Sequence, residues 1–191
     1  WSGPAAAASY NAIQPEKVHR IFILCPNHRM PVSGAASVSA DAFETPLGTL
    51  SADRALVDAW AADGVISIDD GAHKLEHAIE IQLPFIQVIF ETPPAIVPII
   101  VGELSAERAR RLADRLRADM KDDDLVLVSS DFLHYGKDYG YVPFGAPVQP
   151  QIQAYDARSV AAIAKIDGPE FERFAAQNPH SACGINALRV L

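Results

Sequence analysis

The sequence predicts an α/β protein, a three-layer α/β/α sandwich with a mostly parallel (mixed) central sheet. Short apolar runs typical of strands buried on both faces occur at residues 21–24, 95–101 and 125–128. Helical patterns separate these runs, so crossovers rather than tight hairpins should connect the main strands. The length of 191 residues and the apolar content of 49% are ordinary for one globular domain. We therefore expect a single α/β domain over residues 1–191.

The remaining elements are expected in chain order. The first half of the chain should contain a short helix at 5–10, antiparallel strands at 36–50, a helix at 52–62 ended by Gly64, and a strand at 65–68. A helix at 76–90 kinked at Pro84 should follow, and then a helix at 105–120 capped by Ser105, with Leu112, Leu116 and Met120 as its buried stripe. Helices at 152–166 and 169–176 and a last helix with Cys183 in its first turns should complete the chain. The helical patterns at the two ends of the sequence, at 5–10 and after Cys183, are incomplete. We expect the domain to lack its N-terminal strand and a C-terminal segment.

Charge and composition disfavour several classes of partner. The net charge is −8, and the arginines of residues 108–117 are interleaved with acidic residues, which is typical of a solvated helix face rather than a nucleic-acid site. The apolar runs fall far short of the roughly 20 residues that span a bilayer. We expect a cytoplasmic protein without a disulfide, because Cys25 and Cys183 lie far apart in the sequence and no secretory signal is seen. The oligomeric state and the ligand, a small molecule or a peptide, stay open.

Polar side chains follow two of the predicted strands at the point where each strand ends. Asn27 and His28 come after the first strand, and Asp131 and His134 come after the run at residues 125–128. The carboxyl ends of strands in open α/β sheets surround the crevice in which ligands bind. If the two strands are neighbours, these groups meet at one edge of the sheet.

Five side chains placed at strand ends or helix starts could share one metal or acid/base site: His28, His77, Asp131, His134 and Cys183. On the predicted helix at 76–90, His77 and Glu80 are three residues apart and face the same side. Imidazole and thiolate suit iron, copper or zinc, whereas calcium and magnesium prefer oxygen ligands alone. The spacing by itself leaves open whether these residues form one site or are separate structural side chains.

Six blocks resemble, in this order, the signature segments of the Memo family: IFILCPNH, ETPLGTL, EHAIEIQLPF, IVPIIVG, SSDFLHYG and ACG before Ile185. Prokaryotic members of that family are called AmmeMemoRadiSam system protein B. The resemblance implies the fold of class III (LigB-like) extradiol dioxygenases, which hold non-haem Fe(II) with two histidines and a carboxylate. In the Memo family a cysteine replaces the carboxylate, and members are reported to bind iron or copper.

Carried over by motif, the resemblance implies that His28 and Cys183 are metal ligands. A further metal histidine is expected in a segment just upstream of Trp1. Iron is the expected cofactor, with copper or zinc as alternatives. Asp131 and His134 are expected to line the same pocket as a catalytic pair, with His134 as the acid/base group oriented by Asp131.

The family's helix motif corresponds to Glu76, His77 and Glu80, and we expect the last two in the pocket with Cys25 and Asn27. Three positions depart from the usual family residues, namely Cys25, Arg29 and Gln82. Cys25 is either a second thiol near the metal or a small buried apolar side chain.

Two functions compete for this pocket. In the first, a mononuclear metal with open positions supports a redox or dioxygenase-like reaction. In the second, the same pocket holds a metal or small ligand without turnover, as in an adaptor. Replacing a carboxylate by a thiolate makes the site softer, which disfavours simple catechol cleavage and favours copper or redox chemistry. A fold analogy cannot choose between the two functions.

Overall fold

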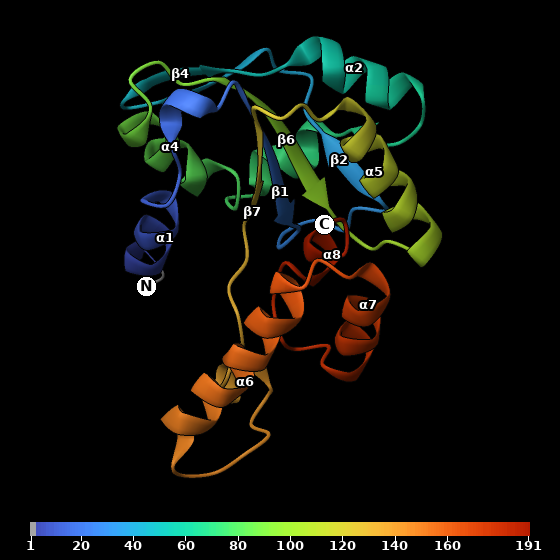
Figure 1. Cartoon of the computed structure of the whole chain (residues 1–191). Helices are drawn as coiled ribbons and strands as arrows, with labels where there is room; N and C mark the ends of the chain where they lie inside the picture. The colour runs from blue at the N-terminus through green and yellow to red at the C-terminus, as the bar shows by residue number, and fades with distance from the viewer. Residues whose placement is uncertain (1–2) are drawn as a thin grey trace.

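The computed structural model describes residues 3–191, in which helices cover both faces of a central sheet (Figure 1). Trp1 and Ser2 of the predicted domain lie outside the described residues. Within residues 3–191 the sheet has five strands in the order β5-β2-β6-β1-β7. Their bounds are β1 (Arg20–Pro26), β2 (Ala35–Ser37), β5 (Ser67–Ile68), β6 (Ala95–Val101) and β7 (Asp124–Val128). β1 is parallel to β6 and β7, whereas β2 is antiparallel to β6, so the predicted mixed, mostly parallel sheet is confirmed.

The helices form two outer layers and a C-terminal group (Figure 1). One face is covered by α1 (Gly3–Tyr10), α3 (Asp70–Leu75) and α4 (Leu83–Ile89), and the other by α2 (Arg54–Ala62) and α5 (Ala106–Asp119). The group beyond the carboxyl ends of the strands consists of α6 (Val148–Ala164), α7 (Gly168–Gln177) and α8 (Ile185–Leu188). A hairpin of β3 (Ala42–Thr45) and β4 (Gly48–Ser51) and three short turns, η1 (Pro15–Lys17), η2 (Glu80–Gln82) and η3 (Lys137–Tyr139), complete the described elements.

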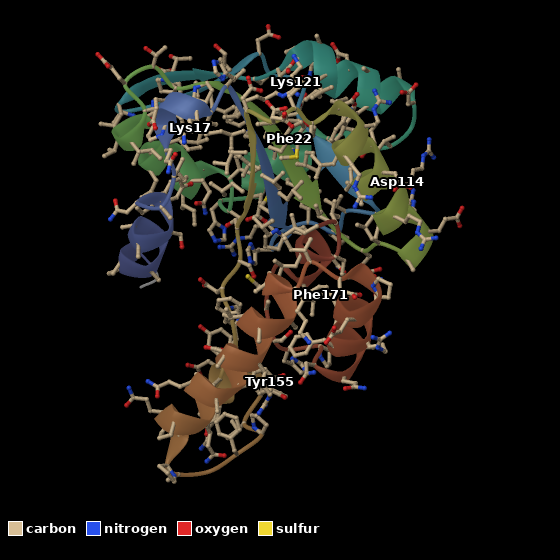
Figure 2. All side chains as sticks on the ribbon, viewed as in Figure 1. Lys17, Phe22, Asp114, Lys121, Tyr155 and Phe171 are labelled. Carbon is tan, nitrogen blue, oxygen red and sulfur yellow. The ribbon has the colours of Figure 1, made fainter. Side chains whose placement is uncertain are left out.

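Alternate residues of β1 build the two cores of the sandwich. Ile21 and Ile23 pack with the α1 and α4 layer, whereas Phe22 and Leu24 pack with the α2 and α5 layer. This alternation follows from the period of two along a strand, and every residue from 21 to 24 is fully buried. Figure 2 shows Phe22 inside the sandwich and Asp114 on the outer surface of α5.

Helix α5 confirms the cap that the sequence predicts. The Ser105 hydroxyl accepts a hydrogen bond from the N–H of Arg108, which satisfies one of the free donors of the first turn. Leu112 and Leu116 are buried, but Met120 is 38% exposed because the helix ends at Asp119. Within residues 3–191, no helix is both long and apolar enough to cross a membrane.

The helix predicted over residues 76–90 is wrong in its first half. Helix α3 ends at Leu75, and Glu76 has an extended backbone with φ −89° and ψ 133°. The Glu76 carboxylate then accepts the N–H groups of His77 and Ala78. Helix α4 begins only at Leu83, with Pro84 in its first turn, where a missing N–H costs no helical hydrogen bond. Pro84 therefore starts a helix instead of kinking one.

Strand β7 is the second correction. It was expected to be buried on both faces, but all five of its residues are only partly buried. The reason is its position at the edge of the described sheet, where it pairs with β1 on one side only. Likewise, Cys183 lies just before α8 and not within it, because Gly184 occupies the N-cap position of that helix.

Candidate metal centre

Strands β1 and β7 deliver their following residues to one edge of the sheet. Leu24 is opposite Val128 in the parallel ladder, and the N–H of Ser129 donates to the Leu24 carbonyl over 2.9 Å. The chain therefore leaves both strands side by side, with His28 after β1 and Asp131 after β7. The two strands are neighbours in the sheet, which is the condition under which the residues that follow them meet at one edge.

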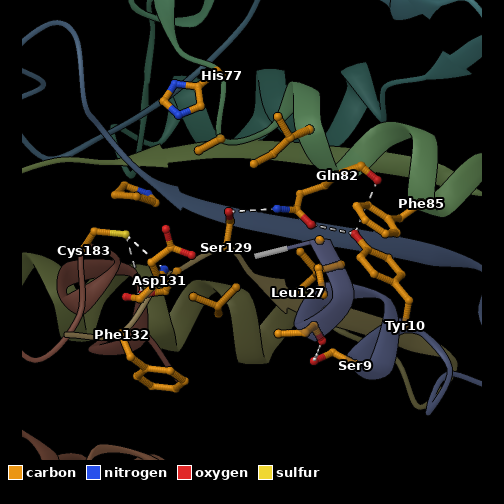
Figure 3. Close-up of a pocket in the computed structure, with 18 of the residues that line it drawn as sticks. Ser9, Tyr10, His77, Gln82, Phe85, Leu127, Ser129, Asp131, Phe132 and Cys183 are labelled. Atoms are coloured by element: carbon orange, nitrogen blue, oxygen red, sulfur yellow. Dashed lines mark hydrogen bonds between the residues drawn. The ribbon is translucent and has the colours of Figure 1, made fainter. Parts of the chain in front are cut away.

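A cavity of about 620 Å³ lies at this edge, between α1, residues 77–85 and β7. Its polar end is lined by His28, His77, Ser130, Asp131 and Cys183, and its apolar end by residues that include Ile13, Ile81, Phe85 and Leu127. Figure 3 shows Cys183, Asp131 and His77 at one end and Tyr10 and Phe85 at the other. The structure thus brings four predicted site residues, His28, His77, Asp131 and Cys183, to a single cavity.

Cys183 is tied to the loop after β7 by a reciprocal pair of contacts. The N–H of Asp131 donates to the Cys183 sulfur over 3.2 Å, and the N–H of Cys183 donates to the Asp131 carbonyl over 3.1 Å. The N–H of Gly184 donates to the Ser130 hydroxyl over 3.0 Å. These contacts fix the Cys183 sulfur against the loop after β7.

Gly184 permits this close approach. A Cβ at this position would lie 2.7 Å from the Ser129 carbonyl oxygen and 2.7 Å from the Ser130 Cβ, both far inside van der Waals contact. The sequence block ACG therefore needs its glycine so that Cys183 can reach the loop after β7.

Glu76 is buried beside two histidines of the cavity. Its Oε2 accepts the backbone N–H of His28 over 2.5 Å, and its Oε1 is 2.9 Å from Nδ1 of the same residue. The N–H groups of His77 and Ala78 also donate to Oε1, each over 2.9 Å. Burial alone would raise the pKa of Glu76, but hydrogen bonds from His28 and Ala78 outweigh it and hold the pKa below its usual value.

The same carboxylate lies close to a second imidazole. Nδ1 of His77 is 3.3 Å from Oε1 of Glu76, and the rings of His28 and His77 are 4.9 Å apart. Within the described residues, ligand atoms of Glu76, His28 and His77 all lie within 4.8 Å of one another, a spacing that could hold a metal ion.

Two of the predicted pocket residues lie elsewhere. Cys25 is fully buried in the core between the sheet and the α1 and α4 layer. Burial raises the pKa of its thiol, helped by the negative charges of Glu76 and Cys183. Of the two alternatives for Cys25, the structure supports the small buried side chain. Asn27 lines a neighbouring hollow, and its amide donates to the Met30 carbonyl.

His134 and Glu80 are also outside the cavity lining. Nε2 of His134 is 3.9 Å from the Asp131 carboxylate, which is too long for a hydrogen bond, and its ring packs on Tyr139 with 4.8 Å between centroids. Glu80 is exposed at the start of η2. It does not share a helix face with His77, because η2 begins only at Glu80 and no helix includes both residues.

A chain of polar groups in the cavity wall was not predicted. The Tyr10 hydroxyl donates to Oε1 of Gln82 over 2.9 Å, and Nε2 of Gln82 donates to the Ser129 hydroxyl over 2.9 Å. Burial raises the pKa of Tyr10, so its hydroxyl remains a donor. In the sequence, Gln82 stands out only as a departure from the family pattern, since Tyr10 and Gln82 are 72 positions apart and no local motif joins them.

The fold and the cavity define an α/β protein with imidazole, thiol and carboxylate groups gathered at one end of its sheet. Comparison with known proteins gives the family. A family model described as Memo-like protein matches residues 1–191, and the chain belongs to that family. The family that the six sequence blocks predict is thereby confirmed.

Several relatives have curated names. The chain is 36% identical over 202 residues to a MEMO1 family protein of Pyrococcus furiosus, covering 100% of this chain and 69% of that protein. It is 29% identical over 198 residues to the protein memo-1 homolog of Caenorhabditis elegans, covering 100% and 57%. It is 28% identical over 199 residues to protein MEMO1 of Mus musculus, covering 100% and 67%. The chain thus spans between 57% and 69% of the length of these relatives.

Proposed function

We propose that this Memo-like protein binds one metal ion, iron first and copper or zinc as alternatives, through His28 and Cys183. The observation that carries the proposal is that both side chains line the same cavity. The hydrogen bond from the Asp131 N–H to the Cys183 sulfur holds that sulfur beside the cavity.

The donors in the cavity fit these metals. Imidazole and thiolate are the ligands of iron, copper and zinc, and they would not serve calcium or magnesium. The resemblance to the Memo family adds a further histidine upstream of Trp1. Asp131 contributes its N–H to the sulfur, so its backbone has a role even where its carboxylate is not a ligand.

The reaction that we propose is a metal-dependent oxidation related to extradiol dioxygenase chemistry. A bound iron or copper would supply redox chemistry at positions left open by the protein. The apolar end of the cavity, with Phe85 and Leu127, would exclude water from the body of a substrate. We place this activity in the cytoplasm, where thiols stay reduced, and both cysteines of the chain are free.

A non-catalytic metal- or ligand-binding adaptor is the second candidate, and one observation favours it. The predicted acid/base residue His134 lies outside the cavity lining and makes no hydrogen bond with Asp131. Oxygen uptake by the metal-loaded protein, with catechols and with thiols, distinguishes the two candidates. Uptake above that of the free metal supports the enzyme, and its absence supports the adaptor.

The metal proposal is tested by metal analysis of protein purified without chelators. We expect His28→Ala and Cys183→Ala to lower the bound metal about tenfold or more, because each removes a ligand. The matched controls are His19→Ala, an exposed imidazole that pairs with Asp123, and Cys25→Ala, the buried thiol of the core. Both controls, and His134→Ala, should keep the metal. Equal metal in Cys183→Ala and Cys25→Ala would contradict the proposal.

A further inference from the structure

Glu76 is a buried carboxylate that accepts hydrogen bonds from two segments of the chain. Its side chain is 3% exposed. Four donors surround it: the backbone N–H and ring Nδ1 of His28, and the backbone N–H groups of His77 and Ala78. Positions 28 and 76 are 48 residues apart, so this carboxylate joins the end of β1 to the segment before η2.

This arrangement decides which nitrogen of His28 carries the proton. An ionised carboxylate can only accept hydrogen bonds, so Nδ1 at 2.9 Å from Oε1 is the nitrogen that carries the proton whenever the ring is neutral. Nε2 then keeps its lone pair. Because His28 lines the cavity while Nδ1 is turned to Glu76, Nε2 is the nitrogen available to a ligand there.

We propose that Glu76 is the positioning residue of the metal centre: it holds His28 as the Nδ1–H tautomer and presents Nε2 to the metal. The proposal rests on the proposed function and deepens it. Metal-binding histidines commonly donate their second ring N–H to a carboxylate, which fixes the ring orientation and raises the basicity of the ligand nitrogen.

The hydrogen bonds also argue against Glu76 as a ligand itself, although it lies within 4.8 Å of both imidazoles. Its Oε1 faces three N–H groups and its Oε2 accepts a short hydrogen bond of 2.5 Å. A metal bound to this carboxylate would have to displace these contacts and leave buried N–H groups without a partner, which is costly.

The first test is the tautomer of His28 in the metal-free protein, read from the ¹⁵N chemical shifts of labelled imidazoles. We expect Nδ1–H in the wild type and in Glu76→Gln, whose amide oxygen can still accept, and loss of this preference in Glu76→Ala. His73 is an internal control, since its Nε2 lies 3.2 Å from the Ala36 carbonyl and should remain protonated in every variant. Finding His28 of the wild type as the Nε2–H tautomer would overturn the proposal, even if no variant folds.

The second test is metal affinity, measured by competition with a chelator of known affinity. We expect Glu76→Ala to weaken binding about 10- to 100-fold, as for other residues that orient a metal ligand, and Glu76→Gln to weaken it less. The matched control is Glu80→Ala, an exposed carboxylate four positions away and outside the cavity. Glu76→Gln losing as much affinity as Glu76→Ala, with the tautomer unchanged, would make Glu76 a ligand and refute the positioning role. If the wild type bound no metal, the proposed function would fail, whereas the tautomer would still be decided by the first test.

Discussion

The two ends of β1 both bury charged groups, but they do so in different ways. At the amino end, the Arg20 guanidinium pairs with Asp53 over 3.2 Å and with Asp124 over 2.5 Å. Burial alone would lower the pKa of Arg20, but these carboxylates raise it above its usual value. The acids and the base of this end use one another as partners, which is the arrangement of a structural ion-pair network.

At the carboxyl end, the hydrogen-bond donors gather around one carboxylate, that of Glu76. Glu76 is saturated by donors, while the Cys183 sulfur and the imidazoles of His28 and His77 border a cavity of about 620 Å³. The comparison shows that buried polar residues at strand ends do not by themselves mark a functional site. What separates the two ends is that imidazole and thiol groups at the carboxyl end face a cavity.

The largest expected effect belongs to the amino end. Asp124→Ala should lower the free energy of unfolding by about 3 kcal/mol, because it leaves part of the buried charge of Arg20 without its partner. The Asp124 side chain is 2% exposed, whereas Asp123 next to it is 47% exposed and pairs with an exposed His19. The control Asp123→Ala should therefore cost less than about 1 kcal/mol. Denaturant unfolding measures both values, and a similar loss in the two variants would refute the distinction.

A smaller effect is expected at the carboxyl end. Gly184→Ala should destabilise the protein by about 1–3 kcal/mol, because its Cβ would overlap the loop after β7. It should also weaken metal binding, since the same loop holds the Cys183 sulfur. Gly145→Ala is the control, because no atom lies within 4 Å of a Cβ at that position. Unfolding and metal competition should show a loss for Gly184→Ala alone, and an unchanged affinity would mean that the loop adapts.

The strands and the capped helix could be predicted because their signals are local. The apolar runs of β1 and β6 and the Ser105 cap of α5 are each contained within a few residues. The run in β7 has the same character, but its place at the edge depends on which strands pair with it. An apolar run therefore identifies a strand without giving its exposure.

The candidate site could be predicted in part. Motif resemblance identified His28, His77, Asp131 and Cys183, which the structure brings to one cavity. The role of Glu76 could not be seen, because helical spacing suggested a continuous helix at 76–90. The Glu76 carboxylate instead accepts the N–H groups of the two residues that follow it and that would have continued that helix. The position of His134 depends on the path of the chain toward η3, for which the sequence carries no periodic signal.

Ligation of the metal by the Cys183 thiolate can be observed in the visible absorption of the protein loaded with Cu(II). A thiolate bound to Cu(II) gives an intense charge-transfer band that imidazole and carboxylate ligands do not give. We expect this band in the wild type and in Cys25→Ala, and its absence in Cys183→Ala. A band that persists in Cys183→Ala, or Cu(II) bound by the wild type without such a band, would refute ligation by the Cys183 thiolate.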